Sequence, residues 1–115
     1  MERIHQFDIW IADLNPRMGT EAGKRRPVVV LQTDLLNESG HPSTIICPLT
    51  TNVQPQSKIL RVGLIAGDNG LNEDCDIMMD QIRAIDNQRL IKRIGSLSES
   101  SKEKVLNNLA ILLDI

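Results

Sequence analysis

Residues 7–31, FDIWIADLNPRMGTEAGKRRPVVVL, contain two apolar segments separated by a polar loop. In the first segment, residues 7–14, apolar side chains occupy both alternating sets of positions, which predicts a β-strand with at least one strongly buried face. Pro27 precedes a β-branched run that predicts a central strand covered on both sides. The intervening loop, residues 15–26, holds one proline, two glycines and a charge cluster. Loops of this length are usually functional.

The rest of the chain alternates short apolar runs with polar turns, and only its end has a clear helical pattern. A short helical turn is predicted from Thr33, and further strands are predicted at residues 44–50, 59–64, 76–85 and 90–97. Ser98 suits a helix N-cap, and apolar residues then recur at helical spacing, namely Val105, Leu106, Leu109, Leu112 and Leu113. We therefore expect a single domain over residues 1–115 that is mainly β with a C-terminal helix, built as a curved, partly open β-barrel.

The composition limits the classes of partner. Thirteen basic and fifteen acidic residues give a net charge of −2, which argues against a protein that coats duplex DNA, so any contact with nucleic acid must be local. Cys47 and Cys75 are too few for a disulfide framework, although one disulfide remains open. The N-terminal residues contain no apolar stretch long enough for a signal peptide or a membrane span. A cytoplasmic location is therefore expected.

No motif in the sequence indicates a metal or nucleotide cofactor, so none is expected. The first candidate for chemistry is Arg26, because the residue before a proline is biased toward extended geometry, which holds its side chain more stiffly than that of a loop arginine. A guanidinium group can donate two parallel hydrogen bonds to phosphate and stabilise the extra negative charge of a pentavalent transition state. The alternative is that the basic residues of this loop only give solubility.

Two further candidates lie near the ends of predicted strands. Thr50 and Thr51 carry hydroxyls that can donate to a phosphate, although β-branched residues also suit a strand or a turn. Asp80 could orient an arginine or accept a proton, or it could form an ion pair for stability alone. On a continuous strand over residues 76–85, Asp80 would share one face with Ile82. Gln81 and Arg83 would then share the opposite face.

Four stretches occur in this order along the chain: FDIWIADLNP, GTEAGKRRPVVVLQ, ICPLTTN and DQIRAID. A final helix introduced by Leu-Ser follows them. With these features the chain resembles the MazF/PemK/Kid toxins of bacterial toxin-antitoxin pairs along nearly its whole length. The GxExGxxRP pattern before an apolar strand is the most specific of them. The resemblance implies an SH3-like barrel of the MazF/Kid/CcdB type that forms a homodimer, with single-stranded RNA in a groove along the interface. It also implies metal-independent cleavage of mRNA at short sequence motifs. The ribose 2′-hydroxyl would attack the adjacent phosphate, giving 2′,3′-cyclic phosphate and 5′-hydroxyl ends.

The resemblance also assigns roles to residues. Arg26 and Thr50 match the catalytic arginine and threonine of the family. The remaining positions expected to contact RNA are Gly19, Thr20, Glu21, Lys24, Arg25, Thr51, Gln81 and Arg83. Arginine is a poor base, so Glu21, Asp80 or water is expected to take the 2′-hydroxyl proton.

Two positions depart from the Kid-type pattern. Met78 stands where Kid-type members have an arginine, and Thr20 replaces a histidine-bearing motif. We therefore expect the variant of the site that relies on arginine and threonine.

The resemblance further implies a protein antitoxin whose acidic, extended tail covers the groove, and whose complex with the toxin binds its own operator DNA. Two other functions remain open at this stage. One is inhibition of DNA gyrase, because the CcdB toxin shares this barrel. The other is a catalytically silent barrel that only binds the antitoxin. The final segment, LAILLDI, lacks the tryptophan-type anchor on which CcdB depends.

Overall fold

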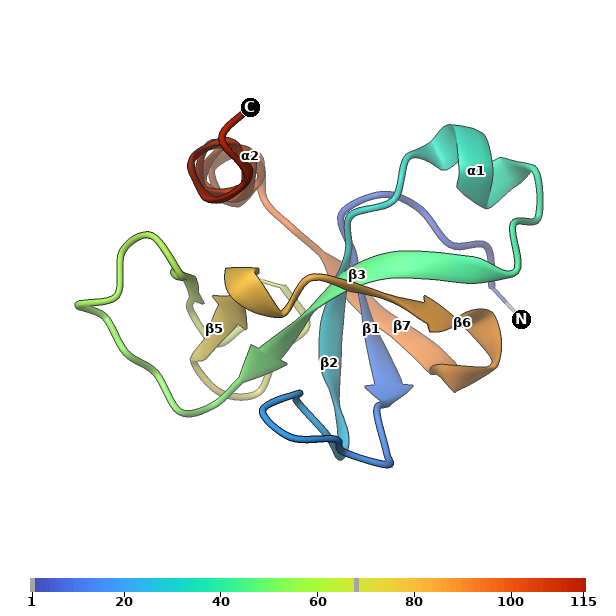
Figure 1. Cartoon of the computed structure of the whole chain (residues 1–115), viewed down its shortest axis with the longest axis horizontal. Coiled ribbons are helices and arrows are strands. Elements are labelled where there is room, and N and C mark those ends of the chain that lie inside the picture. Colours follow the sequence, from blue (N-terminus) through green and yellow to red (C-terminus); the bar gives the residue numbers. More distant parts are fainter. Residues whose placement is uncertain (1, 68) are drawn as a thin grey trace.

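The computed structural model describes residues 2–67 and 69–115, which form one curved antiparallel sheet with two α-helices (Figure 1). The strands are β1 (Asp8–Asp13), β2 (Arg25–Val30), β3 (Ser43–Thr50), β4 (Arg61–Leu64), β5 (Cys75–Met78), β6 (Arg83–Asp86) and β7 (Leu90–Ser96). The helices are α1 (Asp34–Glu38) and α2 (Glu99–Leu113), with short 3-10 helices η1 (Met79–Gln81) and η2 (Asn87–Arg89).

The strands follow the order β4-β5-β3-β2-β1-β7, and β6 also pairs with β3. Within the described residues, the end strands β4 and β7 are not paired with each other, so the sheet does not close into a barrel. The predicted mainly β, partly open architecture with a C-terminal helix is confirmed.

The sheet buries side chains on both of its faces. Ile9 and Val29 belong to a core that α2 covers through Val105, whereas their neighbours Trp10 and Val28 belong to a second core on the other face. All five side chains are fully buried. This alternation is the two-sided burial that the apolar runs around residues 7–14 and 27–31 predict.

Helix α2 begins as predicted, because the Ser98 side chain caps it by accepting a hydrogen bond from the backbone N–H of Ser101. Val105 is fully buried, and two further leucines, at positions 109 and 112, pack against the same core. Leu106 and Leu113 are instead about half exposed, at 51% and 49%, so only part of the apolar set at helical spacing lies on the buried face. Among the described residues, no helix has the length and apolar character needed to cross a membrane.

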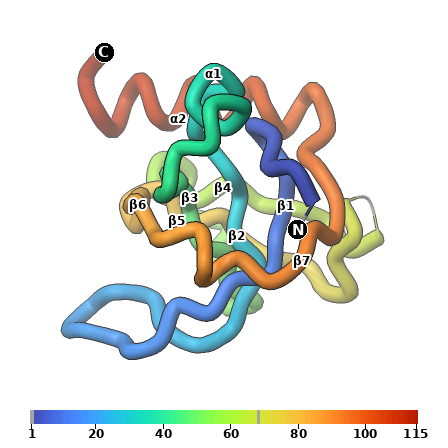
Figure 2. The backbone as a smooth tube through the Cα atoms, turned by 90° about the vertical axis from the view of Figure 1, so that its right-hand side faces the viewer, coloured from blue at the N-terminus to red at the C-terminus, as the bar shows by residue number. Residues whose placement is uncertain are grey.

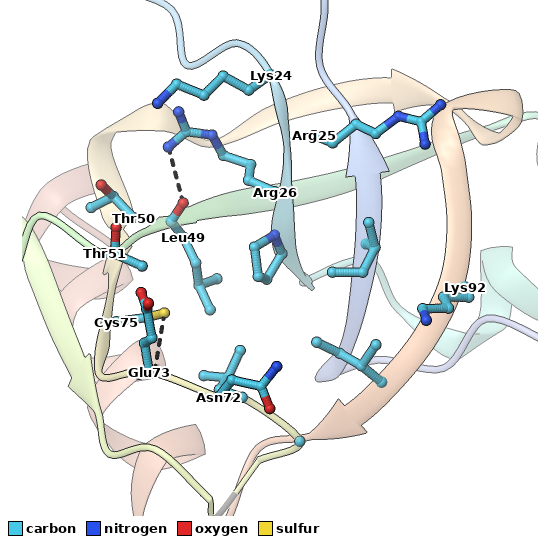
Figure 3. A pocket seen from close by; sticks show the side chains of 15 residues that line it. Lys24, Arg25, Arg26, Leu49, Thr50, Thr51, Asn72, Glu73, Cys75 and Lys92 are labelled. Carbon is cyan, nitrogen blue, oxygen red and sulfur yellow. Dashed lines mark hydrogen bonds between the residues drawn. The ribbon is translucent and has the colours of Figure 1, made fainter.

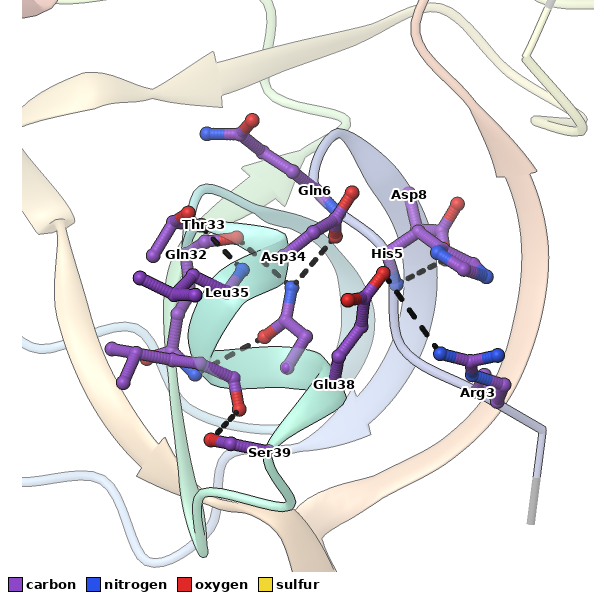
Figure 4. A network of polar contacts seen from close by, with 12 residues as sticks. Arg3, His5, Gln6, Asp8, Gln32, Thr33, Asp34, Leu35, Glu38 and Ser39 are labelled. Atoms are coloured by element: carbon purple, nitrogen blue, oxygen red, sulfur yellow. Dashed lines mark hydrogen bonds and ion pairs between the residues drawn. The ribbon is translucent and has the colours of Figure 1, made fainter.

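The predicted helical turn after Thr33 is confirmed as α1, which a polar network joins to the N-terminal segment (Figure 4). The Thr33 hydroxyl accepts a hydrogen bond from the N–H of Leu35. One Asp34 carboxylate oxygen accepts hydrogen bonds from the Gln6 backbone at 2.7 Å and from the Asn37 side chain at 3.1 Å. These bonds lower the pKa of Asp34.

The prediction of one continuous strand over residues 76–85 is wrong. The chain forms β5, bends through η1 and continues as β6, and both strands pair antiparallel with β3. The interruption lies opposite Cys47 and Pro48, and Pro48 has no N–H to donate to a neighbouring strand. The predicted alternation of Asp80, Gln81 and Arg83 between two faces therefore does not hold.

The loop between β1 and β2, residues 14–24, projects from one end of the sheet (Figure 2). It ends two residues earlier than predicted, because the last two arginines of the basic cluster already belong to β2. Gln81 of η1 holds this loop with both ends of its amide. Its oxygen accepts from the Ala22 N–H at 3.3 Å, and its nitrogen donates to the Thr20 carbonyl at 3.3 Å.

The loop between β4 and β5, described at residues 65–67 and 69–74, comes into direct backbone contact with β7 at residues 69 and 70. Gly70 has a φ of +77° and lies against the carbonyl of Ile94, and Gly95 lies against the carbonyl of Asn69. A Cβ atom at either glycine would overlap that carbonyl. The two glycines therefore fix how closely this loop approaches the sheet.

We predict that Gly95→Ala lowers the free energy of unfolding by about 1–3 kcal/mol, because a backbone must shift to admit the methyl group. Gly63→Ala is the matched control, since Gly63 also lies in a strand but an added Cβ would meet its nearest atom at 3.6 Å. That control should change the free energy by no more than about 0.5 kcal/mol. Urea unfolding of both variants measures the difference, and equal stability would contradict the close contact.

We also predict that Gln81→Ala frees the β1–β2 loop. Losing two hydrogen bonds should raise the rate of tryptic cleavage after Arg17, Lys24 or Arg25 at least about fivefold. Gln88→Ala, in the other 3-10 helix, is the control, and it should leave the rate unchanged. Unchanged cleavage of the Gln81 variant would show that the amide does not hold the loop.

Candidate functional site

The side chain of Arg26 is fixed by two backbone carbonyls. Its Nε donates to the Gly23 carbonyl at 2.8 Å, and its Nη1 donates to the Leu49 carbonyl at 3.0 Å. The side chain is half-buried, and this burial, followed by the nearby charge of Arg17, lowers the pKa of Arg26. The stiffness predicted from the following proline is therefore reinforced by hydrogen bonds from both sides.

Thr50 directly follows Leu49 at the end of β3, so the carbonyl that binds Arg26 also places Thr50 beside it. The Thr50 hydroxyl accepts a hydrogen bond from the N–H of Asn52 at 3.1 Å. Arg26 and Thr50, together with Lys24, line two adjoining cavities. We call these three residues the ridge. The structure thus brings together the two side chains that the sequence singles out.

The larger cavity, about 540 Å³, lies on the sheet and is called the sheet pocket (Figure 3). Apolar side chains of the sheet, Ile11, Pro27 and Ile94, form part of its lining. The cations Arg25 and Lys92 lie on the side of β2, β1 and β7, and the β4–β5 loop lines the other side with Asn72 and Glu73. The pocket therefore combines apolar surface with a basic rim.

The second cavity, about 400 Å³, lies between the β1–β2 loop and the end of β3, and is called the loop pocket. Arg17, Glu21 and Gln81 line it in addition to the ridge. Arg61 also lines it, but the Arg61 guanidinium pairs with the buried Asp76 carboxylate at 3.2 Å. Arg61 is therefore engaged within the fold.

Most of the predicted contact residues line one of these pockets. Arg25 and Thr51 line the sheet pocket, Thr20, Glu21 and Gln81 line the loop pocket, and Lys24 lines both. Gly19, Asp80 and Arg83 line neither.

Asp80 and Arg83 have other surroundings. Asp80 is exposed on η1, and its charge adds to burial, the main cause, in raising the pKa of Cys47 to about 12. Arg83 is half-buried, and its Nη1 has no hydrogen-bond partner within the described part of the chain. Cys47 and Cys75 are both free thiols, so the disulfide left open by the sequence is absent.

Several lining residues were not predicted from the sequence. The alternation of residues 90–97 places Lys92 and Ile94 on one face of a strand, but only the pairing of β7 with β1 brings them to the sheet pocket. Glu73 and Asn72 lie in a turn-rich loop whose sequence shows no motif. Arg17 stands in the charged loop, where no feature of the sequence distinguishes it.

The local charge of the site differs from that of the whole chain. Four cations line the sheet pocket beside one carboxylate, although the net charge of the chain is −2. In residues 2–67 and 69–115, no three His, Cys, Asp or Glu side chains gather as a metal site would require. The arrangement can bind a phosphodiester at the ridge and a nucleotide on either side of it.

Comparison with known proteins gives a consistent assignment. A family model described as PemK-like, MazF-like toxin of type II toxin-antitoxin system matches residues 5–113. Endoribonuclease EndoA of Bacillus subtilis is 37% identical over 110 residues, which cover 96% of this chain and 94% of EndoA. The crystal structure of MazF from Deinococcus radiodurans matches with a TM-score of 0.84 at 22% identity, covering 100% of both chains. An endoribonuclease in complex with its cognate antitoxin from a mycobacterial species matches with a TM-score of 0.76 at 16% identity, over 100% of this chain and 97% of that one. The chain therefore belongs to the family of PemK-like, MazF-like toxins of type II toxin-antitoxin systems.

Proposed function

We propose that this chain is the toxin of a toxin-antitoxin pair and acts as an endoribonuclease that cuts single-stranded mRNA at short sequence motifs. The observation that carries the proposal is the ridge, where a fixed guanidinium, a hydroxyl and an ammonium group line two adjoining pockets. Family membership supports it, and so does the name of EndoA, an endoribonuclease.

In this proposal Arg26 and Thr50 hold the scissile phosphate and place the ribose 2′-hydroxyl in line with the leaving 5′-oxygen. The 2′-oxygen forms a bond to phosphorus while the bond to the 5′-oxygen breaks, which leaves a 2′,3′-cyclic phosphate and a 5′-hydroxyl. Arg26 stabilises the developing negative charge. The pKa of Arg26 is also lowered, which makes it easier for the guanidinium to donate a proton to the 5′-oxygen.

Of the two carboxylates that the resemblance suggests, Glu21 is better placed than Asp80 to take the proton of the 2′-hydroxyl. It lines the loop pocket together with both Arg26 and Thr50, whereas Asp80 lines neither pocket. Water is the alternative acceptor. Positive charge at the phosphate comes from Arg26 and Lys24, so the mechanism requires no metal ion or other cofactor.

We further propose that the partner is a protein antitoxin with an acidic, extended segment. Such a segment would bind the basic rim of the sheet pocket and compete there with RNA. The mycobacterial relative solved in complex with its cognate antitoxin supports such a partner. A homodimer in the cytoplasm, and binding of the toxin-antitoxin complex to its operator DNA, are further parts of this proposal.

We predict that the purified protein cleaves a long single-stranded RNA in EDTA and leaves 2′,3′-cyclic phosphate and 5′-hydroxyl ends. Arg26→Ala and Thr50→Val should each lower the single-turnover rate by about 100-fold or more, because each removes a group that acts on the reacting phosphate. Thr50→Ser should retain most of the activity, since it keeps the hydroxyl.

Arg25→Ala is the control for general electrostatics, because the Arg25 side chain is 71% exposed and its ion-pair distance to Asp13 is 3.9 Å. This variant should lower the affinity for RNA and make that affinity less dependent on salt. Its single-turnover cleavage rate should fall much less than that of Arg26→Ala. Intact RNA with the parent protein would refute the nuclease and leave gyrase inhibition or silent antitoxin binding. An Arg26→Ala variant as fast as the parent would refute the site.

A further inference from the structure

We infer that Glu73 contacts the base of the nucleotide in the sheet pocket and selects a base with an exocyclic amino group over uracil. This inference rests on the proposed ribonuclease function, because it names a residue that determines the sequence preference of that same site.

The backbone around Glu73 is held by contacts of the β4–β5 loop with β7 and within the loop itself. Gly70 brings the β4–β5 loop into backbone contact with β7, and the Gly67 N–H donates to the Leu71 carbonyl at 2.9 Å. The Cys75 thiol donates to the carbonyl of Glu73 itself at 3.5 Å. These contacts hold the backbone of Glu73 beside the sheet pocket, so the fold carries its carboxylate into the lining of that pocket.

The charge of Glu73 does not suit binding of the RNA backbone. The other charged side chains of the sheet pocket are all cations, namely Lys24, Arg25, Arg26 and Lys92, which attract phosphate. Glu73 would repel phosphate, and within the described chain no cation lies close enough to form an ion pair with it. The buried carboxylates Asp8 and Asp76, in contrast, are both paired with arginines.

The surroundings of Glu73 suit a nucleobase. Ile11, Pro27 and Ile94 offer apolar contacts for the flat face of a base, and the cavity volume of about 540 Å³ lies within the usual range of about 300–1,000 Å³ for ligand pockets. In Figure 3 the Glu73 side chain extends from the loop toward the end of the pocket that Thr51 lines. A base against these apolar side chains would present its polar edge to the carboxylate.

A carboxylate only accepts hydrogen bonds, which determines the bases that it favours. Adenine, cytosine and guanine each present an exocyclic amino group that donates to a carboxylate. Uracil presents two carbonyl oxygens on either side of a single N–H, and these oxygens would be repelled. Glutamine at position 73 could donate to a uracil oxygen, so it should accept both kinds of base.

The test uses a pool of single-stranded RNA randomised around the cleaved bond, with sequencing of the ends formed by the parent, Glu73→Gln and Glu103→Gln. The parent should prefer an amino-bearing base over uracil at one position, and Glu73→Gln should reduce that preference by about tenfold at that position alone. Glu103→Gln makes the same charge change on the exposed surface of α2 and should leave every preference unchanged.

Glu73→Gln should fold like the parent, because the Glu73 side chain is exposed and its described hydrogen bond uses the backbone carbonyl. Circular dichroism and urea unfolding check this. An unchanged preference in a cleaving Glu73→Gln variant would overturn the inference, and so would an equal loss of rate on all sequences. A parent that neither cleaves nor binds RNA would instead refute the proposed function, and the inference with it.

Discussion

The guanidinium of Arg26 is held by two neutral carbonyls rather than by a carboxylate, and the remainder of the site is arranged around this contact. The carbonyls of Gly23 and Leu49 belong to a loop and a strand far apart in the sequence, so the side chain joins the two. Because neither partner carries a charge, the positive charge of the arginine stays available to an anion. Burial lowers the pKa of Arg26, which is the expected electrostatic effect of holding an uncompensated cation at the sheet.

Two loops complete the site, and each is held by a contact with another element of the fold. The amide of Gln81 holds the β1–β2 loop, which carries Glu21, and the contact between Gly70 and Gly95 holds the β4–β5 loop, which carries Glu73. One carboxylate therefore lines each pocket beside the shared cationic ridge. In the proposed function the ridge binds phosphate, Glu21 takes a proton and Glu73 selects a base, so the three roles lie at different places in the site. Each role needs few charged side chains, so a chain with a net negative charge can form such a site.

Local patterns were sufficient to predict the strands around residues 7–14 and 44–50 and the helix after Ser98, which follow from periodicity and a helix cap. The resemblance to the toxin family, and no local pattern, joined Arg26 to Thr50 in one predicted site. The break after β5 could not be predicted, since it depends on how β5 and β6 pair with β3, a strand distant in the sequence. Lys92 and Glu73 were missed for the same reason, because long-range strand pairing and a close glycine contact bring them to the pocket.

The break at η1 also changes the interpretation of the DQIR segment. On a continuous strand, the acidic residue and the glutamine would point to opposite faces, and either could contact the substrate directly. In the 3-10 helix, Asp80 faces solvent and Gln81 turns its amide onto the β1–β2 loop. The oxygen of that amide accepts from the Ala22 N–H, and its nitrogen donates to the Thr20 carbonyl. Because the carbonyl of Gly23, the residue after Ala22, binds the guanidinium, this segment can determine the geometry of Arg26 through the loop.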